Sequence, residues 1–263
     1  MKVKLIQATQ NPIEVMWVSA RTCYSGKSPI ELWEDSCTTS TNKKKDLVNK
    51  VLSSGHSSIA EHVHFTFVIE GISRACSHQL VRHRLCTFSQ QSQRYVEIKE
   101  NAQEILQLIF QFKDVVSENN IEKATELQNR LTEIANTYFV DVNKEDIITY
   151  CMYLVNYLTK VEDGCKPEDA RNFLPNATKT NLVLTTNLRN LMHISEIRLC
   201  TRAQKEIRNL FKLIKEEVTK QNEMLGSMLI VQCDKLGYCP EHKSCGRKPT
   251  RDEIWGKNES NNI

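Results

Sequence analysis

Strand-like segments in this chain are few, and helical segments separate them without a regular strand-helix-strand rhythm. Residues 3–9 have the composition of a strand, and residues 64–70 and 177–187 alternate with the period of two expected for a half-buried strand. Scattered strands of this kind favour an α+β fold over a doubly wound one. We therefore expect mixed helices around a small, largely antiparallel sheet.

Apolar residues elsewhere recur at the spacing of helices. Ser73 is expected to cap a helix that runs to about Arg84. A long helical region over residues 102–139 is expected to break near residues 117–120. The other predicted helices span residues 12–20, 45–54, 144–161 and 188–226.

The apolar and charged fractions of the chain are those of an ordinary soluble globular protein. With 263 residues the chain can bury the core of one large domain, with or without an appendage. Its net charge of +3 is too small to argue for a nucleic-acid or membrane partner. The N-terminus lacks the apolar run of a signal peptide, and no stretch of about 18 apolar residues follows. We expect a cytoplasmic protein whose ten cysteines are mostly reduced thiols.

Glycine-rich phosphate loops are absent from the sequence. Its eight glycines form neither a Gly-x-Gly pattern nor a Gly-Lys-Ser or Gly-Lys-Thr element, which excludes a dinucleotide fingerprint and a P-loop. Side chains must therefore hold any phosphate-bearing ligand. The lysine run at residues 43–45 is expected to be the solvated start of a helix, with phosphate binding as the alternative.

The segment at residues 82–95 combines basic and neutral polar side chains. It begins Arg-His-Arg and continues through Ser-Gln-Gln-Ser-Gln to Arg94. On a helix, Gln79 would share a face with Arg82 and His83. Guanidinium groups suit phosphate because they stay charged and donate two parallel hydrogen bonds. The segment is predicted to hold an anion beside a polar ring; the plainer alternative is a helix C-terminus stabilised by basic residues.

The strand-like composition of residues 87–96 extends this predicted site. A period of two would place Phe88, Gln90, Ser92 and Arg94 on one side of the strand. The three polar members of that set would then continue the anion-binding surface.

Several ordered motifs give the chain a resemblance to a known family. The pattern Arg-His-Arg, seven residues and Ser at positions 82–92 is similar to the signature of flavin-dependent thymidylate synthases. Residues 54–62 resemble that family's histidine-containing Glu-His segment, and the similarity covers roughly residues 5–210. Further matching elements are Ala20-Arg21-Thr22-Cys23-Tyr24, Ala170-Arg171-Asn172-Phe173-Leu174-Pro175, Thr186-Asn187-Leu188-Arg189, His193 and Arg198.

The resemblance implies an enzyme of thymidylate biosynthesis. In that reaction dUMP is methylated to dTMP, 5,10-methylenetetrahydrofolate donates the one-carbon unit, and FAD reduced by NADPH supplies the hydride. The resemblance also implies a homotetramer with shared active sites, and no nucleic-acid or membrane partner. The cysteine-dependent class of thymidylate synthase is disfavoured because the sequence has no Pro-Cys-His element.

The same resemblance assigns site residues. Arg198 matches the catalytic arginine that contacts the uracil ring and favours its N3-ionised form. The residues implied to bind dUMP are Gln79, Arg82, Gln90, Gln91, Ser92, Gln93, Arg94, Arg171 and Arg198. The residues implied to surround FAD are His56, Ser58, Arg82, His83, Arg84, Gln90, Asn187, Arg189 and His193.

Elementary chemistry adds to these assignments. On the predicted helix, Arg189 and His193 share a face while Arg198 lies opposite Arg189, so we expect this helix to lie between subunits. Ser92 has no visible His-Asp relay and is interpreted as a hydrogen-bonding residue rather than a nucleophile. Gln90 stands where the family can carry Glu, and its amide cannot act as a base.

Residues 231–263 are expected to be a Cys-rich extension, partly disordered at its end, of a catalytic domain over residues 1–230. Cys233, Cys239, His242 and Cys245 have the ligand types of a tetrahedral zinc site. The alternative is a plain loop with reduced thiols, and we assign no metal site.

A rival function from another class is a non-catalytic nucleic-acid-binding module built on the basic residues at 82–84 and 43–45. Such a module would be colourless, and its affinity for DNA or RNA would fall steeply with salt. An enzyme of the resembled family would instead bind a yellow flavin.

Overall fold

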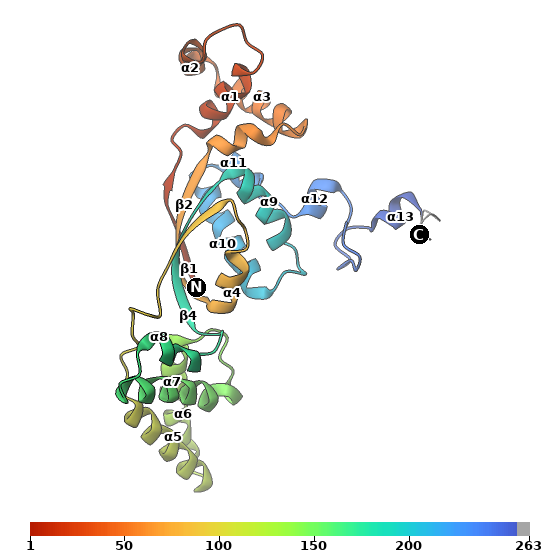
Figure 1. Ribbon diagram of the computed structural model, residues 1–263. Coiled ribbons are helices and arrows are strands. Elements are labelled where there is room, and N and C mark those ends of the chain that lie inside the picture. Colours follow the sequence, from red (N-terminus) through yellow and green to blue (C-terminus); the bar gives the residue numbers. More distant parts are fainter. Residues whose placement is uncertain (257–263) are drawn as a thin grey trace, which may run out of the picture. The chain divides into compact units, whose positions relative to one another are not determined.

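The computed structural model describes residues 1–256 of the chain (Figure 1). It contains helices and a small four-stranded antiparallel sheet, which confirms the predicted α+β class. The strands are β1 (Lys2–Ala8), β2 (His64–Ser73), β3 (Cys86–Gln90) and β4 (Lys179–Asn187). The α-helices are α1 (Pro12–Thr22), α2 (Pro29–Thr38), α3 (Thr41–Ser53), α4 (Arg74–Leu80), α5 (Ala102–Ser117), α6 (Ile121–Tyr138), α7 (Ile147–Glu162), α8 (Pro167–Ala170), α9 (Leu188–Arg198), α10 (Lys205–Gln221), α11 (Glu223–Ser227), α12 (Gln232–Leu236) and α13 (Arg251–Trp255). The 3-10 helices are η1 (Ser57–His62), η2 (Lys144–Asp146) and η3 (Arg171–Phe173).

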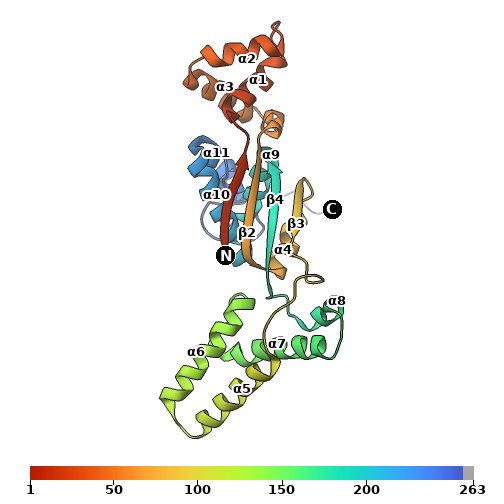
Figure 2. The same ribbon diagram turned by 90° about the vertical axis from the view of Figure 1, so that its left-hand side faces the viewer.

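The sheet has the strand order β1-β2-β4-β3, so β4 lies between two strands from much earlier in the chain (Figure 2). The chain forms two compact units. The first contains Met1–Ile69, Leu80–Phe88 and the chain from Val183 onward, and the second contains Glu70–Gln79 and Ser89–Leu182. The boundary between the units falls within β2, β3 and β4.

In the first unit, α9 and α10 lie on the same face of the strands (Figures 1 and 2). α10 packs along β1 and against α9, and α9 packs against η1. Phe65 of β2, Leu184 of β4 and Phe211 of α10 are fully buried. Removing such side chains from water is the main stabilising contribution to this core, and it fixes α9 beside the strands.

The three N-terminal helices of the first unit enclose a buried charge. α1 packs against α2 and α3. Lys44 of α3 is 5% exposed, and its ammonium group lies 2.6 Å from the Glu14 carboxylate and 2.9 Å from the Ser36 carbonyl oxygen. The expectation that the whole lysine run is solvated is therefore wrong for Lys44, whereas Lys43 is exposed. Local sequence could not show that the second lysine faces two other helices.

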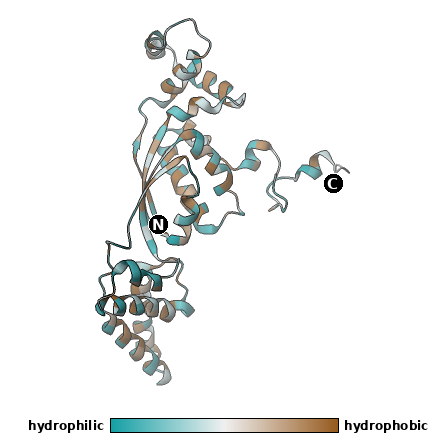
Figure 3. Cartoon of the chain, viewed as in Figure 1, coloured by the Kyte–Doolittle hydropathy of each residue, from teal (hydrophilic) through white to brown (hydrophobic). Residues whose placement is uncertain are grey.

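The second unit has a helical core of its own. α5, α6 and α7 pack against one another, and their buried side chains include Leu108, Leu131 and Leu154. Hydrophobic and hydrophilic stretches alternate along these helices (Figure 3), as expected for helices that bury one stripe. The predicted break in the 102–139 region is confirmed, because α5 ends at Ser117 and α6 begins at Ile121.

Several predicted boundaries are wrong. α4 ends at Leu80, so Arg82 and His83 lie in a turn and not on a helix beside Gln79. β3 ends at Gln90, and the following residues turn away from strand geometry.

The predicted single helix over residues 188–226 is in fact three helices. α9 ends at Arg198, and the side chain of Gln204 caps the start of α10 by accepting a hydrogen bond from the Ile207 N–H. Sequence analysis also missed α2, although Ser28 and Glu31 form a capping box at its start.

No helix within residues 1–256 is long and apolar enough to cross a bilayer. The predicted disorder at the extreme C-terminus concerns residues 257–263, which lie outside the described part of the chain.

Candidate active site

The Arg-His-Arg motif lies in the turn between α4 and β3, in the first unit. The backbone N–H of His83 donates a hydrogen bond to the Leu80 carbonyl, which holds the turn at the end of α4. Arg82 and Arg84 are exposed, and neither has an ion-pair or hydrogen-bond partner within residues 1–256. Two guanidinium groups are thus available to a ligand at this turn.

His83 contacts the last residue of α9. Nε of Arg198 donates a hydrogen bond of 3.0 Å to Nε2 of His83. Burial, together with the charges of Arg198 and His193, lowers the pKa of His83 to about 4. The imidazole is therefore neutral near pH 7, with its lone pair on Nε2 and its proton on Nδ1. Because His83 is neutral, it orients the Arg198 guanidinium without neutralising its positive charge.

The start of α9 lies beside η1. Leu188 N–H donates to the Val63 carbonyl at 2.7 Å, and Arg189 forms an ion pair with Glu61. The side chain of Asn187 caps α9 by accepting from the Asn190 N–H at 2.9 Å. Arg189 and Arg198 thus have different partners, as expected for residues on opposite sides of the helix.

The remaining residues assigned to FAD lie on these same elements. His56 immediately precedes η1 and Ser58 lies within it, while His193 lies on α9. All three are exposed. The first unit therefore gathers a set of cationic and neutral donors on η1, α9 and the turn after α4.

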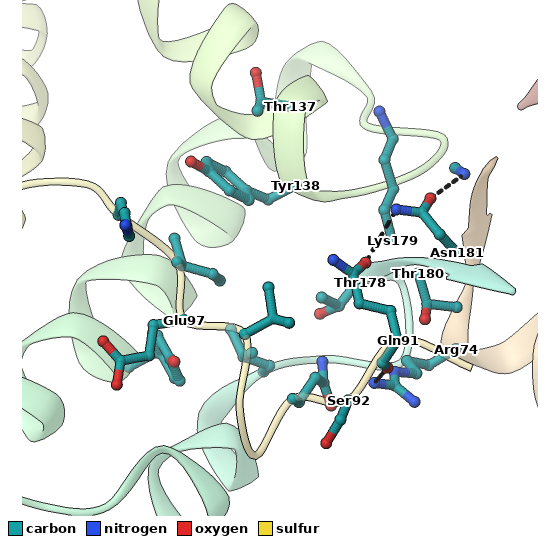
Figure 4. A pocket seen from close by; sticks show the side chains of 17 residues that line it. Arg74, Gln91, Ser92, Glu97, Thr137, Tyr138, Thr178, Lys179, Thr180 and Asn181 are labelled. Atoms are coloured by element: carbon teal, nitrogen blue, oxygen red, sulfur yellow. Dashed lines mark hydrogen bonds between the residues drawn. The ribbon is translucent and has the colours of Figure 1, made fainter. Parts of the chain in front are cut away.

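The second unit contains a cavity of about 440 Å³, which is lined by part of the predicted dUMP-binding set. Gln91, Ser92 and Gln93 line it together with Arg74, and Tyr138 lies on another wall (Figure 4). The backbone of Gln91 is fixed by hydrogen bonds with the Asn181 carbonyl at 2.9 Å and with the Arg74 guanidinium at 3.0 Å. Asn181 also donates to the Gln91 side-chain oxygen at 3.0 Å.

Arg94 and Arg171 both contact Glu168. Nε of Arg94 lies 2.7 Å from the Glu168 carboxylate, and Nε of Arg171 donates to the Glu168 backbone carbonyl at 2.9 Å. Both arginines are exposed, and neither lines the cavity. Glu168 thus holds two of the four guanidinium groups of the predicted dUMP set near one another.

Gln79 and Gln90 do not line the cavity either. The Gln90 amide donates to the hydroxyl groups of Ser77 at 2.9 Å and Thr180 at 3.2 Å, both of which are buried residues. Gln90 therefore ties β3 to its neighbours in this structure. Gln79 lies on α4 and is half-buried.

Arg74 is the main site residue that the sequence analysis missed. Its Nε is buried and has no hydrogen-bond partner within residues 1–256. Burial and the charge of Arg171 lower the pKa of its guanidinium. Nothing in the sequence marked it, because Arg74 stands in a mixed polar and apolar stretch at the start of a predicted helix.

The predicted dUMP set falls in both compact units. Arg82 and Arg198 belong to the first unit. Those in the second are Gln79, Gln90, Gln91, Ser92, Gln93, Arg94 and Arg171. Apart from Gln90, the residues assigned to FAD all belong to the first unit.

The four candidate zinc ligands of the Cys-rich extension do not all line one cavity. Within residues 1–256, no three histidine, cysteine or acidic side chains are placed so that they could hold a metal ion. Cys233, Cys239 and Cys245 do line one small cavity, but the fourth candidate, His242, does not, and Cys200 takes its place.

Comparison with known proteins identifies the family. The family described as "Thymidylate synthase complementing protein" matches residues 4–222. A flavin-dependent thymidylate synthase of Pyrococcus horikoshii is 38% identical over 248 residues, which cover 92% of this chain and 90% of that protein. The chain belongs to the flavin-dependent thymidylate synthase family. The corresponding synthase of Geobacter sulfurreducens is 40% identical over 210 residues, covering 80% of this chain and 78% of its own length.

Solved structures share the fold of this family member. The flavin-dependent thymidylate synthase of Helicobacter pylori, solved with FAD and dUMP, aligns with a TM-score of 0.64 at 23% identity and covers 88% of this chain and all of its own. A UMP/dUMP methylase of Streptomyces cacaoi, solved with 5-bromo-dUMP, aligns with a TM-score of 0.59 at 19% identity, covering 86% of this chain and 93% of its own. At these identities the likeness supports the fold alone.

Proposed function

We propose that this protein converts dUMP to dTMP by reductive methylation, with 5,10-methylenetetrahydrofolate as the one-carbon donor and FAD reduced by NADPH as the source of hydride. Membership of the family, over nearly the whole chain, is the observation that carries the proposal. We further propose a catalytic domain over residues 1–230, followed by the Cys-rich extension, and a homotetramer with shared sites.

In this proposal, the cavity of the second unit and its surroundings bind dUMP. Gln91, Ser92 and Gln93 present uncharged donors and acceptors to the sugar and base. Arg94 and Arg171 supply charge-assisted hydrogen bonds to the phosphate. Arg74 adds a guanidinium whose buried Nε has no hydrogen-bond partner within residues 1–256, and an anionic ligand would satisfy that donor.

Arg198 has the proposed catalytic role. Its guanidinium stays charged while it donates to neutral His83, so it can stabilise negative charge that develops on the uracil ring. Ionisation at N3 makes C5 of the ring more nucleophilic toward the one-carbon unit. His83 would keep the Arg198 fork in one orientation during this step.

The donors of the first unit suit FAD. Arg82, Arg84 and Arg189 would neutralise its pyrophosphate, while His56, Ser58 and His193 are exposed donors on neighbouring elements. When bound, the flavin supplies the hydride chemistry that no protein side chain offers. In addition, we assign Asn187, His83 and Gln90 to its surroundings.

Ser92 is proposed to bind and not to attack. Its hydroxyl accepts a hydrogen bond from the Arg94 N–H at 3.1 Å. A serine nucleophile requires an adjacent base, and the side chain of Gln90 cannot act as one. The one-carbon transfer therefore proceeds in this proposal without a covalent bond to the protein.

A visible spectrum distinguishes the enzyme from the nucleic-acid-binding module, which the comparisons do not favour. We expect the purified protein to bind FAD, to be yellow, and to bleach when NADPH is added without oxygen. A colourless protein that does not take up FAD, but binds DNA or RNA with steep salt dependence, would support the module instead.

The role of Arg198 is tested by Arg198→Ala and Arg198→Lys. We expect both variants to bind FAD and oxidise NADPH, and Arg198→Ala to lose dTMP formation by at least about 100-fold, the effect of removing one donor to a developing charge. Arg198→Lys should remain impaired because the ammonium group lacks the planar fork. Full synthase activity in Arg198→Ala would show that this residue is not catalytic.

A further inference from the structure

A second cavity, of about 50 Å³, lies in the first unit beside the C-terminal end of α9. Four cysteine side chains line it: Cys200, Cys233, Cys239 and Cys245. All four are free thiols. They come from the residues just after α9, from α12 and from the loop that follows α12. The proposed reaction uses none of them.

Polar contacts hold this loop in place. Arg202 donates hydrogen bonds to the Glu241 carboxylate at 3.2 Å and to the Lys243 carbonyl at 2.9 Å. Cys239 is 7% exposed, and its N–H donates to the Pro249 carbonyl at 2.7 Å. Lys235 of α12 forms an ion pair with Glu196 of α9. The four thiols therefore face one cavity because the loop is fixed against the end of α9.

Cys245 differs from the other three thiols. It is exposed, whereas Cys239 is buried and Cys200 and Cys233 are half-buried. Thr201 and the backbone at Arg247 favour the thiolate form and so lower the pKa of Cys245. Burial instead raises the pKa of Cys233. An exposed thiol with a lowered pKa, lining one cavity with three further thiols, is the arrangement of a peroxide-sensitive cysteine.

We propose that Cys245 is an oxidation site for hydroperoxides and that Cys200 captures its oxidised form as a disulfide. Cys200 is the expected partner because both thiols line the same cavity and because Cys200 adjoins Thr201, the residue that contributes most to the lowered pKa of Cys245. The disulfide would tie the C-terminal loop to the chain two residues after Arg198. This inference does not depend on the proposed synthase activity.

The chemistry balances with hydrogen peroxide as the oxidant. The Cys245 thiolate attacks one peroxide oxygen, the O–O bond breaks, and the departing oxygen leaves as water after proton uptake, giving a sulfenic acid. The Cys200 thiol then attacks the Cys245 sulfur, forming the S–S bond and releasing a second water. Two thiols are oxidised and one peroxide is reduced to two waters.

The test uses the full-length protein, reduced and then treated with one equivalent of hydrogen peroxide at neutral pH. After alkylation of the remaining thiols, non-reducing peptide mapping should find Cys200 linked to Cys245. In Cys200→Ser, the linked species should be lost and a sulfenic acid at Cys245 should be trapped by dimedone. Cys37→Ser is the matched control, because Cys37 is an exposed thiol on α2 away from the cavity. That variant should form the disulfide as the parent protein does.

Competition between thiols gives a second measurement. Under limiting peroxide, we expect Cys245 to be oxidised several-fold faster than Cys37, because its lowered pKa increases the fraction of reactive thiolate. Equal rates, or a disulfide that joins a different pair, would overturn the proposal. So would one equivalent of zinc in the purified protein that Cys245→Ser abolishes, because the thiols would then be metal ligands.

Discussion

The hydrogen bond from Arg198 to His83 constrains the protonation state of both residues. Nε2 of His83 can accept from a guanidinium only in the neutral imidazole. The partial burial of the ring and the neighbouring positive charge of Arg198 favour the same state. The central histidine of the motif thus acts in this structure as an acceptor that orients an arginine.

We predict that His83 titrates near pH 4, well below the ordinary histidine value of 6.5. The unfolded state then binds more protons between these two pH values, so stability rises with pH through this window. The contribution of His83 to folding stability should therefore be complete above pH 6.5, and it should be lost as the pH falls toward 4. The change of the His83 ring signal with pH, measured by NMR, checks this. His83→Gln identifies that signal and should flatten the acid side of the thermal-stability profile. A midpoint near 6.5 would contradict the assignment.

Sequence motifs located most candidate residues, but their contacts depend on distant segments. The motif at residues 82–92 predicted polar and cationic groups, which the structure places in a turn and a loop. Arg74 could not be recognised as a site residue, because only the folded chain brings it beside Gln91. Gln90 was expected to face a ligand, whereas its amide pairs with Ser77 and Thr180.

At the scale of elements, composition and alternation predicted β1, β2 and β4 because both are local properties. Helix ends were less predictable. The apolar period of residues 188–226 continues through the break after Arg198, and the cap at Gln204 is a weak signal in the sequence. This break makes Arg198 the last residue of α9, which allows its side chain to reach His83.

Buried Lys44 of α3 pairs with Glu14 of α1 and donates to a carbonyl of α2. Lys44→Ala would leave the Glu14 carboxylate and the Ser36 carbonyl without their cationic partner. We expect a loss of stability of about 1–3 kcal/mol, the usual cost of an unsatisfied polar group. Hydrogen exchange over residues 12–53 should speed up in this variant. Lys43→Ala is the matched control, because Lys43 is exposed and adjacent. Equal exchange in the two variants would show that the ion pair does not stabilise these helices.

At the scale of the whole molecule, the residues predicted to bind dUMP and FAD lie in two compact units. Sequence motifs predicted which residues bind a nucleotide and which a flavin, but the division into units depends on a sheet whose strands come from distant parts of the chain. An assembly with shared sites would allow different copies to complete one site.

We predict a homotetramer in solution. Size-exclusion chromatography with light scattering should give about four times the mass of one chain, 30.4 kDa. Synthase activity should fall on dilution in parallel with dissociation. A fully active monomer would rule out shared sites.

The most direct measurement of the proposed function is dTMP formation by the purified protein. The complete reaction contains dUMP, FAD, NADPH and 5,10-methylenetetrahydrofolate, and each component is omitted in turn. We predict that dTMP forms in the complete reaction, that tetrahydrofolate appears as its co-product, and that each omission abolishes turnover. Unchanged dUMP in the complete reaction, with a folded protein that has bound FAD, would contradict the proposed function.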